Sequence, residues 1–314
     1  MKAIQIETFG GPEVMKFVDL PDPIAKGSQV LVDITSIGIN YADTHQTENS
    51  YLSQQTLPLI PGMEIAGFAD GKRVVGLSAS GGYAQKCVAN PATLVEIPAA
   101  VSDEAAVALF VQGLTAWHLI KTIGRFTPGE TVVVHAAAGG VGTLAVQLAK
   151  LWGGKVIAVA STQEKMAFAE SLGADIVLDS HSDLKSTIKA ANGGKGVDLV
   201  LEMVGGSTFD DSLASLASFG RIVTFGMASR TAPTPVHPGS LMAGSKTISG
   251  FWLADCFGKR EMIHDVMHEL FELVIAGKLR PIIGAIYPLS QARQAHEAML
   301  ARATHGKITL NPAL

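Results

Sequence analysis

The 314-residue sequence predicts an α/β protein in which a β-rich region is followed by a doubly wound parallel sheet. Three observations predict this fold. From residue 131 onward, short apolar runs alternate with segments of helical character, as in parallel sheets whose strands are joined by helices. The run HAAAGGVG, residues 135–142, joins the first of those strands to the first helix. The first hundred residues hold short apolar runs separated by prolines, which leave little room for long helices.

The β-rich region begins at the N-terminus. Apolar runs predict strands at residues 1–7, 30–34 and 73–77. Ser102, followed by two acidic residues, has the pattern of a helix N-cap and predicts a helix from 105 to about 109. A second helix is expected from about 115 to 123.

The alternating region supplies the parallel sheet. Its strands are expected at 131–135, 155–160, 176–178, 197–201, 221–225 and 247–249. The helices between them are expected at 141–151, 163–172, 183–191 and 208–217. In such sheets, ligands bind at the carboxyl ends of the strands, near the point where the strand order reverses. We therefore expect a ligand beside the turn that follows the first strand.

The C-terminal residues are expected to fold back onto the N-terminal region. A long amphipathic helix at 261–276 ends at Gly277. A short strand, a helix at about 291–301 and a final strand at 307–310 follow it. The sequence thus predicts two domains, and the expected bounds are 1–112 with 261–314 for one and 113–260 for the other.

Composition and charge exclude several classes of protein. The chain is 47% hydrophobic and 17% charged, which suits a well-packed enzyme. Its net charge is −4 without a basic stripe, so nucleic acid is not an expected partner. We expect no membrane partner, because no apolar stretch looks long and charge-free enough to cross a bilayer. The N-terminus lacks the apolar core of a signal peptide, and Cys87 and Cys256 have no metal-ligand or disulfide spacing, which favours a reducing cytoplasm.

The glycine-rich turn has the pattern of a dinucleotide site. It contains Ala137-x-Gly139-x-x-Gly142, so an alanine stands where the usual fingerprint has its first glycine. Such a turn lets the backbone approach a pyrophosphate, and the helix N-terminus supplies N–H groups and positive potential. We expect this contact from the backbone of residues 138–142, that is Ala138, Gly139, Gly140, Val141 and Gly142. The alternative is a glycine-rich turn without a ligand.

The residues after the second strand of the sheet select the cofactor. An acid there would bind the ribose diol of NAD(H), but Ser161, Thr162 and Lys165 follow the strand instead. Hydroxyl groups and a lysine favour the 2′-phosphate of NADP(H). The alternative is that Ser161 is only a helix N-cap and Lys165 only a solvated residue.

Several stretches together resemble a known family. They are INYAD at 39–43, PGMEIAG at 61–67, GGYA at 81–84, QGLTA at 112–116, GFWL at 250–253 and GKITL at 306–310. In this order and with the glycine turn, they resemble the zinc-free quinone oxidoreductase (zeta-crystallin-like) branch of the medium-chain dehydrogenase/reductase superfamily. The resemblance implies a GroES-like substrate domain made from both ends of the chain, an inserted Rossmann nucleotide domain, a cleft between them and a homodimer or homotetramer, of which we expect the homodimer.

The resemblance also bears on zinc. Zinc-dependent relatives have a cysteine at the position of Asn40 and a histidine at the position of Met63, and they carry a four-cysteine lobe that this chain lacks. Catalytic zinc needs about three protein ligands. Asp43, His45 and Glu64 are a conceivable substitute set, but we expect no metal. The segment between Gly67 and Arg73 is also shorter than the family's usual hairpin.

The same resemblance assigns candidate site residues. Asn40 is expected near the nicotinamide, although it also suits a turn. Tyr51 corresponds to a substrate-side tyrosine that can supply a proton, or it is an exposed loop residue, and loop-borne His45 is a weaker proton donor. Thr115 is expected beside the nicotinamide or as a helix N-cap. The strand-end residues expected on that side of the cleft, with core packing as the alternative for the aromatic ones, are Phe225, Gly226, Phe251 and Trp252.

These features predict NADPH-dependent transfer of a hydride to a small-molecule acceptor, either a quinone or an α,β-unsaturated carbonyl (enone or enal), without zinc. Without zinc, a simple alcohol lacks the metal that would help it lose its proton, which disfavours alcohol oxidation. One alternative is reduction of a 2-enoyl thioester. An alternative of another class is a non-catalytic NADPH-binding protein with a stress or structural role.

Overall fold

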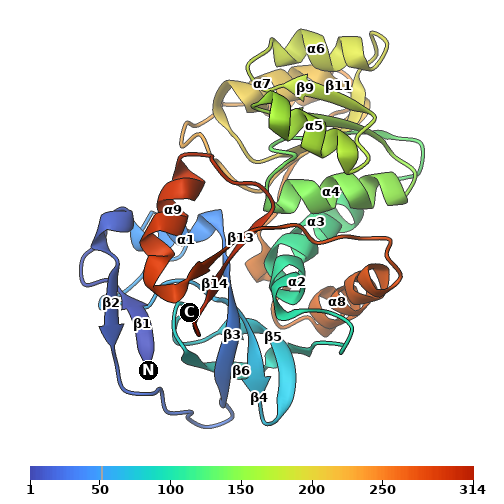
Figure 1. Cartoon of the computed structure of the whole chain (residues 1–314). Helices are drawn as coiled ribbons and strands as arrows, with labels where there is room; N and C mark the ends of the chain where they lie inside the picture. The colour runs from blue at the N-terminus through green and yellow to red at the C-terminus, as the bar shows by residue number, and fades with distance from the viewer. Residues whose placement is uncertain (51) are drawn as a thin grey trace. The chain divides into compact units, whose positions relative to one another are not determined.

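The computed structural model describes residues 1–50 and 52–314. The chain forms two compact units (Figure 1). One contains Met1–Val111 and Cys256–Leu314, and the other contains Gln112–Asp255. Both ends of the chain therefore belong to the same unit.

The first unit is built on an antiparallel sheet that closes on itself. Strands β3 to β6 are neighbours in chain order, and β6 also pairs with β3, from Val30↔Ala89 to Asp33↔Lys86. The C-terminal strand β14 joins the sheet beside β3, and β13 pairs with β14 in parallel. The strands are β3 (Val30–Ile39), β4 (Glu64–Ala69), β5 (Lys72–Ser78), β6 (Lys86–Glu96), β13 (Ile283–Pro288) and β14 (Lys307–Asn311).

A core of aliphatic side chains fills this unit, together with Tyr83 and side chains of the C-terminal helix. The helices of this unit are α1 (Tyr41–Thr47), α8 (Arg260–Ile275) and α9 (Ala292–Leu300), with the short helices η1 (Pro12–Val14) and η6 (Leu289–Gln291). The short helix η5 (Leu253–Cys256) lies where the chain passes from the second unit back to the first. Gly277, with φ +68°, follows α8 as expected for a C-terminal glycine. Both cysteines are buried thiols.

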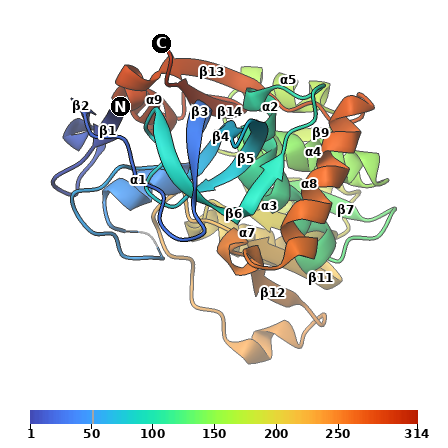
Figure 2. The ribbon, with the colours of Figure 1, turned by 90° about the horizontal axis from the view of Figure 1, so that it is seen from below.

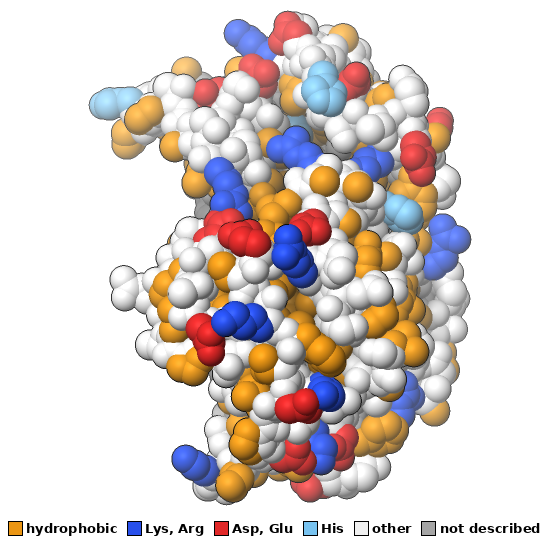
Figure 3. All heavy atoms as spheres, turned by 60° about the vertical axis from the view of Figure 1, so that its left-hand side comes forward, with side chains coloured by type: hydrophobic (Ala, Val, Ile, Leu, Met, Phe, Trp, Pro, Cys, Tyr) orange, Lys and Arg blue, Asp and Glu red, His pale blue; other side chains and the backbone are white. Residues whose placement is uncertain are grey.

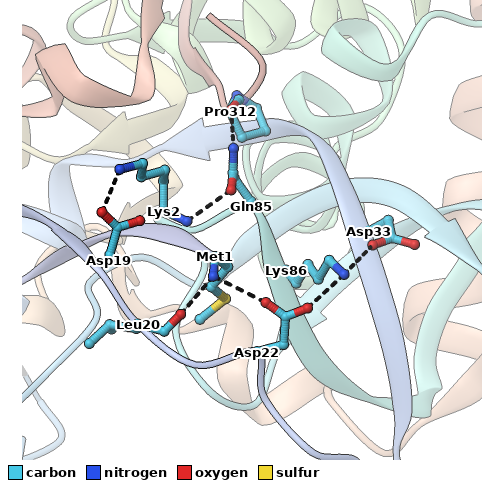
Figure 4. A network of polar contacts seen from close by, with 9 residues as sticks. All are labelled: Met1, Lys2, Asp19, Leu20, Asp22, Asp33, Gln85, Lys86 and Pro312. Carbon is cyan, nitrogen blue, oxygen red and sulfur yellow. Dashed lines mark hydrogen bonds and ion pairs between the residues drawn. The ribbon is translucent and has the colours of Figure 1, made fainter.

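Polar contacts tie the N-terminal hairpin of β1 (Lys2–Gln5) and β2 (Lys16–Asp19) to the sheet (Figure 4). The ammonium group of Met1 donates to the Leu20 carbonyl oxygen at 2.6 Å and lies 3.1 Å from an oxygen of Asp22. The other oxygen of Asp22 accepts from Lys86 Nζ at 2.7 Å. This chain of contacts joins the first residue to β6.

A helix of 21 residues, Asp103–Ile123, leads into the second unit. It consists of α2 (Asp103–Val107), a π-helical turn (Ala108–Gly113), α3 (Leu114–His118) and a second π-helical turn (Leu119–Ile123). Ser102 Oγ accepts from the N–H of Ala105 at 3.1 Å, which confirms the predicted N-cap. By length and composition this helix could cross a membrane, so the expectation that no such segment exists was wrong, and 67% of its most apolar window is buried in the protein.

The second unit contains a six-stranded sheet in the order β12-β11-β10-β7-β8-β9, and every strand pair is parallel. The strands are β7 (Thr131–Val134), β8 (Lys155–Ala160), β9 (Ile176–Asp179), β10 (Val197–Glu202), β11 (Leu216–Thr224) and β12 (Thr247–Gly250). Strand order reverses at β7, which pairs with β8 on one side and β10 on the other. The predicted doubly wound sheet is confirmed, and the end of β7 is the position at which such sheets are expected to bind a ligand.

Helices flank this sheet (Figure 1). They are α4 (Gly140–Leu151), α5 (Gln163–Ser171), α6 (Leu184–Ala191) and α7 (Gly206–Ser215). The predicted helix 208–217 extends too far, because Leu216 already belongs to β11. Between β11 and β12 an irregular segment extends from the sheet and carries the short helix η4 (Pro238–Leu241) (Figure 2).

The short segment after β4 is a two-residue hairpin turn. Ala69 and Lys72 are the last paired residues, and Asp70 and Gly71 between them have φ +49° and +76°. Positive φ at both central positions is the type I′ arrangement, for which Asp-Gly is a preferred sequence. The hairpin is therefore as short as the sequence indicated.

Candidate functional site

The turn between β7 and α4 has the geometry expected of a phosphate-binding loop. Ala136 has φ +49°, and its carbonyl oxygen accepts from the N–H of Gly139 at 2.8 Å. The N–H groups in the first turn of α4 have no acceptor within the helix, as at any helix N-terminus. The turn therefore presents backbone donors and positive potential at the end of the central strand, which fits a pyrophosphate.

The glycines of this turn have different reasons to be glycine. A Cβ on Gly142 would lie 2.3 Å from the carbonyl oxygen of Ala136, so the helix and the turn touch there through backbone atoms alone. A Cβ on Gly140 would lie 2.1 Å from the Gln112 side chain. A Cβ on Gly139 would meet only the Ala136 oxygen, at 3.2 Å. Gly139 thus leaves open space in which a ligand can approach the backbone.

The end of β8 carries the side chains expected to bind a 2′-phosphate. Ser161 and Thr162 follow Ala160, and α5 begins at Gln163. Thr162 is the N-cap, because its hydroxyl oxygen accepts from the Lys165 N–H at 3.2 Å. The alternative that Ser161 is the N-cap is therefore wrong. The position directly after the strand carries no acid.

The residues expected on the nicotinamide side lie at two neighbouring strand ends. Phe225 and Gly226 follow β11, and Phe251 and Trp252 follow β12. The three aromatic residues are only partly buried, so they are not core residues. The Phe251 ring lies 5.7 Å from the His118 ring, centroid to centroid, which brings the end of β12 to helix α3. Thr115 lies inside that helix, 8% exposed, and is not its N-cap.

Two buried ionisable residues of this unit were missed by the sequence analysis. Glu202 ends β10, and one of its carboxyl oxygens accepts from the N–H groups of Val204 and Gly205 at 2.7 and 2.9 Å. Its other oxygen has no partner among the described residues, and burial raises the pKa of Glu202. His135 lies 2.8 Å from Ser212 Oγ, and burial lowers the pKa of His135 to about 4. An acid directly after an apolar strand was the signal for Glu202.

In the first unit, Asn40 lies between β3 and α1 and is held by two charged residues. Its Oδ1 accepts from Lys307 Nζ at 2.9 Å, and its Nδ2 donates to Glu64 Oε2 at 2.8 Å. Lys307 and Glu64 also form an ion pair, and both side chains are fully buried. The other oxygen of Glu64 accepts from the Val111 N–H at 2.6 Å. These contacts fix which way the Asn40 amide faces.

A second buried chain of hydrogen bonds reaches the backbone of Asn40. Asp43 Oδ2 accepts from the Asn40 N–H and from the Tyr83 hydroxyl, each at 2.9 Å. The Tyr83 oxygen lies 2.8 Å from His296 Nε2 on α9. Burial raises the pKa of Asp43 to about 6, lowers that of His296 to about 4, and raises that of Tyr83 well above its usual value, with the Asp43 charge adding to this last effect.

The conceivable metal ligands are engaged elsewhere. Glu64 is paired with Lys307, Asp43 with Tyr83, and His45 Nδ1 lies 2.9 Å from Ser50 Oγ. His45 belongs to helix α1 and not to the expected loop. In residues 1–50 and 52–314, no group of three or more His, Cys, Asp and Glu side chains could hold a metal ion. Tyr51, the expected proton donor, lies outside the described residues.

Charged side chains of both signs are interspersed on the face drawn in Figure 3. On that face, the described residues form no continuous basic stripe. This distribution agrees with the net charge of −4.

A doubly wound parallel sheet with a dinucleotide-type turn, together with a closed antiparallel sheet built from both ends of the chain, defines a medium-chain dehydrogenase or reductase. Two family models match: the alcohol dehydrogenase GroES-like domain over residues 26–99 and the zinc-binding dehydrogenase family over 140–272. The predicted GroES-like and Rossmann fold class is confirmed.

Full-length relatives narrow the class. Quinone oxidoreductase 1 of Escherichia coli is 35% identical, with 98% of this chain and 99% of that protein covered. Quinone oxidoreductase of Sus scrofa is 32% identical, with 99% and 97% covered. The structure of Escherichia coli quinone oxidoreductase complexed with NADPH matches with a TM-score of 0.93 and 33% identity, over 99% of this chain and 100% of that one. The chain belongs to the quinone oxidoreductase family.

Proposed function

We propose that this chain is an NADPH-dependent oxidoreductase that passes a hydride to a quinone or to the β-carbon of an enone or enal, without zinc. The observation that carries the proposal is the Asn40 amide, which is held by a buried ammonium and a buried carboxylate. Zinc-dependent relatives place a metal ligand at this position. Lys307 already places a positive charge beside Asn40, and this charge would repel a metal cation there.

The cofactor assignment rests on the end of β8 and on the relatives. Hydroxyl and ammonium donors for a 2′-phosphate are present on Ser161, Thr162 and Lys165. No acid directly follows the strand, so no carboxylate there would repel the phosphate. The Escherichia coli relative forms a complex with NADPH. In this chain the backbone of residues 138–142 would bind the pyrophosphate. Thr115 and the strand-end aromatic residues would contact the nicotinamide.

The bound cofactor supplies the hydride, and the chain's residues place and shield the reactants. Negative charge develops on the acceptor oxygen as the hydride arrives, and an amide N–H such as that of Asn40 stabilises it. Tyr51 or water supplies the proton that completes the reduction. We also propose that the two units are the substrate and nucleotide domains, and that the protein is a cytoplasmic homodimer.

The proposal is tested by following NADPH oxidation with a 1,4-quinone, a short enone and a crotonyl thioester, with NADH as the cofactor control. Turnover on the quinone or the enone that a chelator leaves unchanged supports the zinc-free reductase. Turnover only with the thioester favours the enoyl-thioester alternative. Tight NADPH binding without turnover on any acceptor favours the non-catalytic role.

The NADP(H) assignment has its own variant. Lys165→Ala should raise the dissociation constant for NADPH and leave that for NADH unchanged, because only NADPH carries the phosphate. Lys185→Ala, in helix α6 of the same unit, is the matched control. An equal rise in the dissociation constants for NADPH and NADH would refute the role of Lys165 in binding the phosphate.

A further inference from the structure

Glu202 is a buried acid at the edge of the sheet where the cofactor is expected to bind. It is the last residue of β10, and none of it is exposed to solvent. The residue before it, Leu201, pairs with Val134, the last residue of β7. Glu202 itself pairs with Thr224, the last residue of β11. The acid therefore lies between the strand that leads into the dinucleotide-type turn and the strand that leads into the expected nicotinamide contacts.

The Glu202 carboxyl group holds the turn that follows its own strand. One of its oxygens accepts from the N–H groups of Val204 and Gly205, at 2.7 and 2.9 Å. Gly205 has φ +80° and ψ −166°, a backbone conformation that in practice only glycine adopts. Helix α7 begins at the next residue, Gly206. The carboxyl group thus fixes the path of the chain from β10 into α7.

This turn in turn supports the segment that follows β11. Four backbone hydrogen bonds join the two segments, from the N–H of Phe225 to the carbonyl oxygen of Glu202, Ala228 to Met203, Ser229 to Val204, and Gly206 to Thr231. The segments also touch at Gly205, where a Cβ would lie 2.8 Å from Met227 Cγ. Phe225 and Gly226, which are expected to contact the nicotinamide, are the first residues of the supported segment.

Stability alone does not explain an acid at this position. The second carboxyl oxygen of Glu202 is buried and has no hydrogen-bond partner within residues 1–50 and 52–314. A buried oxygen without a partner is costly, and burial accordingly raises the pKa of Glu202. A serine or threonine can accept from a nearby backbone N–H without leaving a second oxygen unpartnered. The glutamate instead reaches two N–H groups at once, and this fixes the turn more completely.

We propose that Glu202 is a positioning residue for the nicotinamide half of the cofactor. Its carboxyl group holds residues 203–205, and these hold the segment 225–231, whose first residues contact the nicotinamide ring. The inference rests on the proposed function and adds one residue to it. Because the Glu202 side chain is fully buried, it acts through the backbone and does not itself contact the cofactor. Loss of the carboxyl group should therefore disturb the nicotinamide half and spare the phosphates, which the residues after β7 and β8 would bind.

Two substitutions at Glu202 separate the hydrogen-bond acceptor from the acid. In Glu202→Gln, the amide oxygen can keep both N–H bonds, because the reverse orientation would set an NH₂ group against two donors. Glu202→Leu keeps a side chain of similar size and removes the acceptor. The matched control is Asp198→Leu, near the other end of the same strand, where a carboxyl oxygen accepts from the Thr131 N–H at 2.8 Å.

We expect Glu202→Leu to raise the dissociation constant for NADPH by about tenfold, the effect of losing about one hydrogen bond. The dissociation constant for 2′-phospho-ADP-ribose, which lacks the nicotinamide, should be unchanged. The kcat should fall by up to about 10²-fold, as for a reactant misplaced by about 1 Å. Glu202→Gln and Asp198→Leu should match wild type in all three quantities, even where the unfolding temperature falls. An equal loss of affinity for both ligands, or the same losses in Glu202→Gln, would overturn the proposal.

Hydrogen exchange in the wild-type protein tests the same coupling without a variant, and so it also serves if Glu202→Leu does not fold. Coupling between two sites is reciprocal, so NADPH should slow the amide exchange of Val204 and Gly205 more than 2′-phospho-ADP-ribose does. Equal protection by the two ligands would refute the positioning role even in an active enzyme. Greater protection by NADPH, in a protein that reduces none of the acceptors, would support the positioning role and refute the reductase.

Discussion

The contact between Gly142 and the turn before it leads to a quantitative prediction. A Cβ at this position would lie 2.3 Å from the Ala136 carbonyl oxygen and 2.7 Å from the Ala137 Cα. Non-bonded carbon atoms in good contact lie about 3.5–4.0 Å apart. Both obstacles are backbone atoms that no rotamer change can move. Gly142→Ala must therefore displace the turn from the helix by about 1 Å, on the scale of the same contact distances.

Two opposing terms set the stability change. Overpacking costs about 1–3 kcal/mol, and the upper end applies because the backbone itself must move. Alanine in a helix recovers about 0.5–1 kcal/mol relative to glycine. The net loss of about 2 kcal/mol corresponds to an unfolding temperature lower by about 4–8 °C. A 1 Å displacement of a positioning element can cost about 10²-fold in catalysis, so kcat/KM for NADPH should fall by about that factor.

Gly139→Ala provides the matched comparison in the same turn. Its Cβ would have a single neighbour, at 3.2 Å, and Gly139 has φ −79°, which alanine adopts readily. The unfolding temperature should stay within about 1 °C, while NADPH binding weakens because the methyl group occupies the space of the pyrophosphate. Thermal unfolding and NADPH titration monitored by fluorescence measure both quantities. A Gly142→Ala protein with wild-type unfolding temperature and NADPH affinity would refute the reasoning.

Four further substitutions test the packing and electrostatics. Burial lowers the pKa of His296 from its ordinary value of 6.5 to about 4, so between these pH values the unfolded protein binds a proton that the folded protein does not. The free energy of unfolding therefore drops by about 3 kcal/mol as the pH falls from 6.5 to 4. His296→Gln should remove this pH dependence, as measured by urea unfolding. The effect of Asp43 on stability has the opposite sign, because its raised pKa lets the folded protein bind a proton more readily than the unfolded protein. Asp43→Asn removes this contribution, so the free energy of unfolding should fall more steeply as the pH is lowered. Arg221→Met removes the two hydrogen bonds, of 2.8 and 2.7 Å, that Arg221 donates to partly buried Glu130. It should cost about 1–3 kcal/mol in urea unfolding, more than the double variant with Glu130→Gln. Gly71→Ala should cost about 1 kcal/mol by calorimetry, because φ is +76° and a Cβ there would contact nothing within 4 Å; an unchanged stability would contradict the strain argument.

The nucleotide-type unit could be predicted closely because its signals are local. Strand β8 has the predicted bounds, Lys155–Ala160, and is a nearly continuous apolar run, as expected for a strand covered on both faces. Helix α4 begins at Gly140, one residue before its expected start. Gly173, with φ +106°, follows α5 and its C-cap residue, at a position where helices often have a glycine. Each of these features is decided by residues within about one turn or one strand.

Two of the elements missed in the first unit, α1 and β6, were missed for a physical reason. Helix α1 buries Asp43, Thr44, Gln46 and Thr47, so its inward face is polar and shows no apolar periodicity. Strand β6 runs through Pro91 and has exposed residues at its centre. Hydrophobic patterns identify an element by the face it buries, and neither element buries a regular apolar face.

The same limit explains which parts of the candidate site the sequence could predict. The turn and the end of β8 were found because one short segment carries all their residues. The Lys307–Glu64 pair joins residues 243 positions apart, and it forms only because β14 returns beside β3. A site that orients a polar group needs buried polar partners, and buried polar groups are what a hydrophobic pattern assigns to the surface. The unit whose strands and helices were hardest to predict is therefore the one in which Asn40 is held by ionised and hydrogen-bonded neighbours.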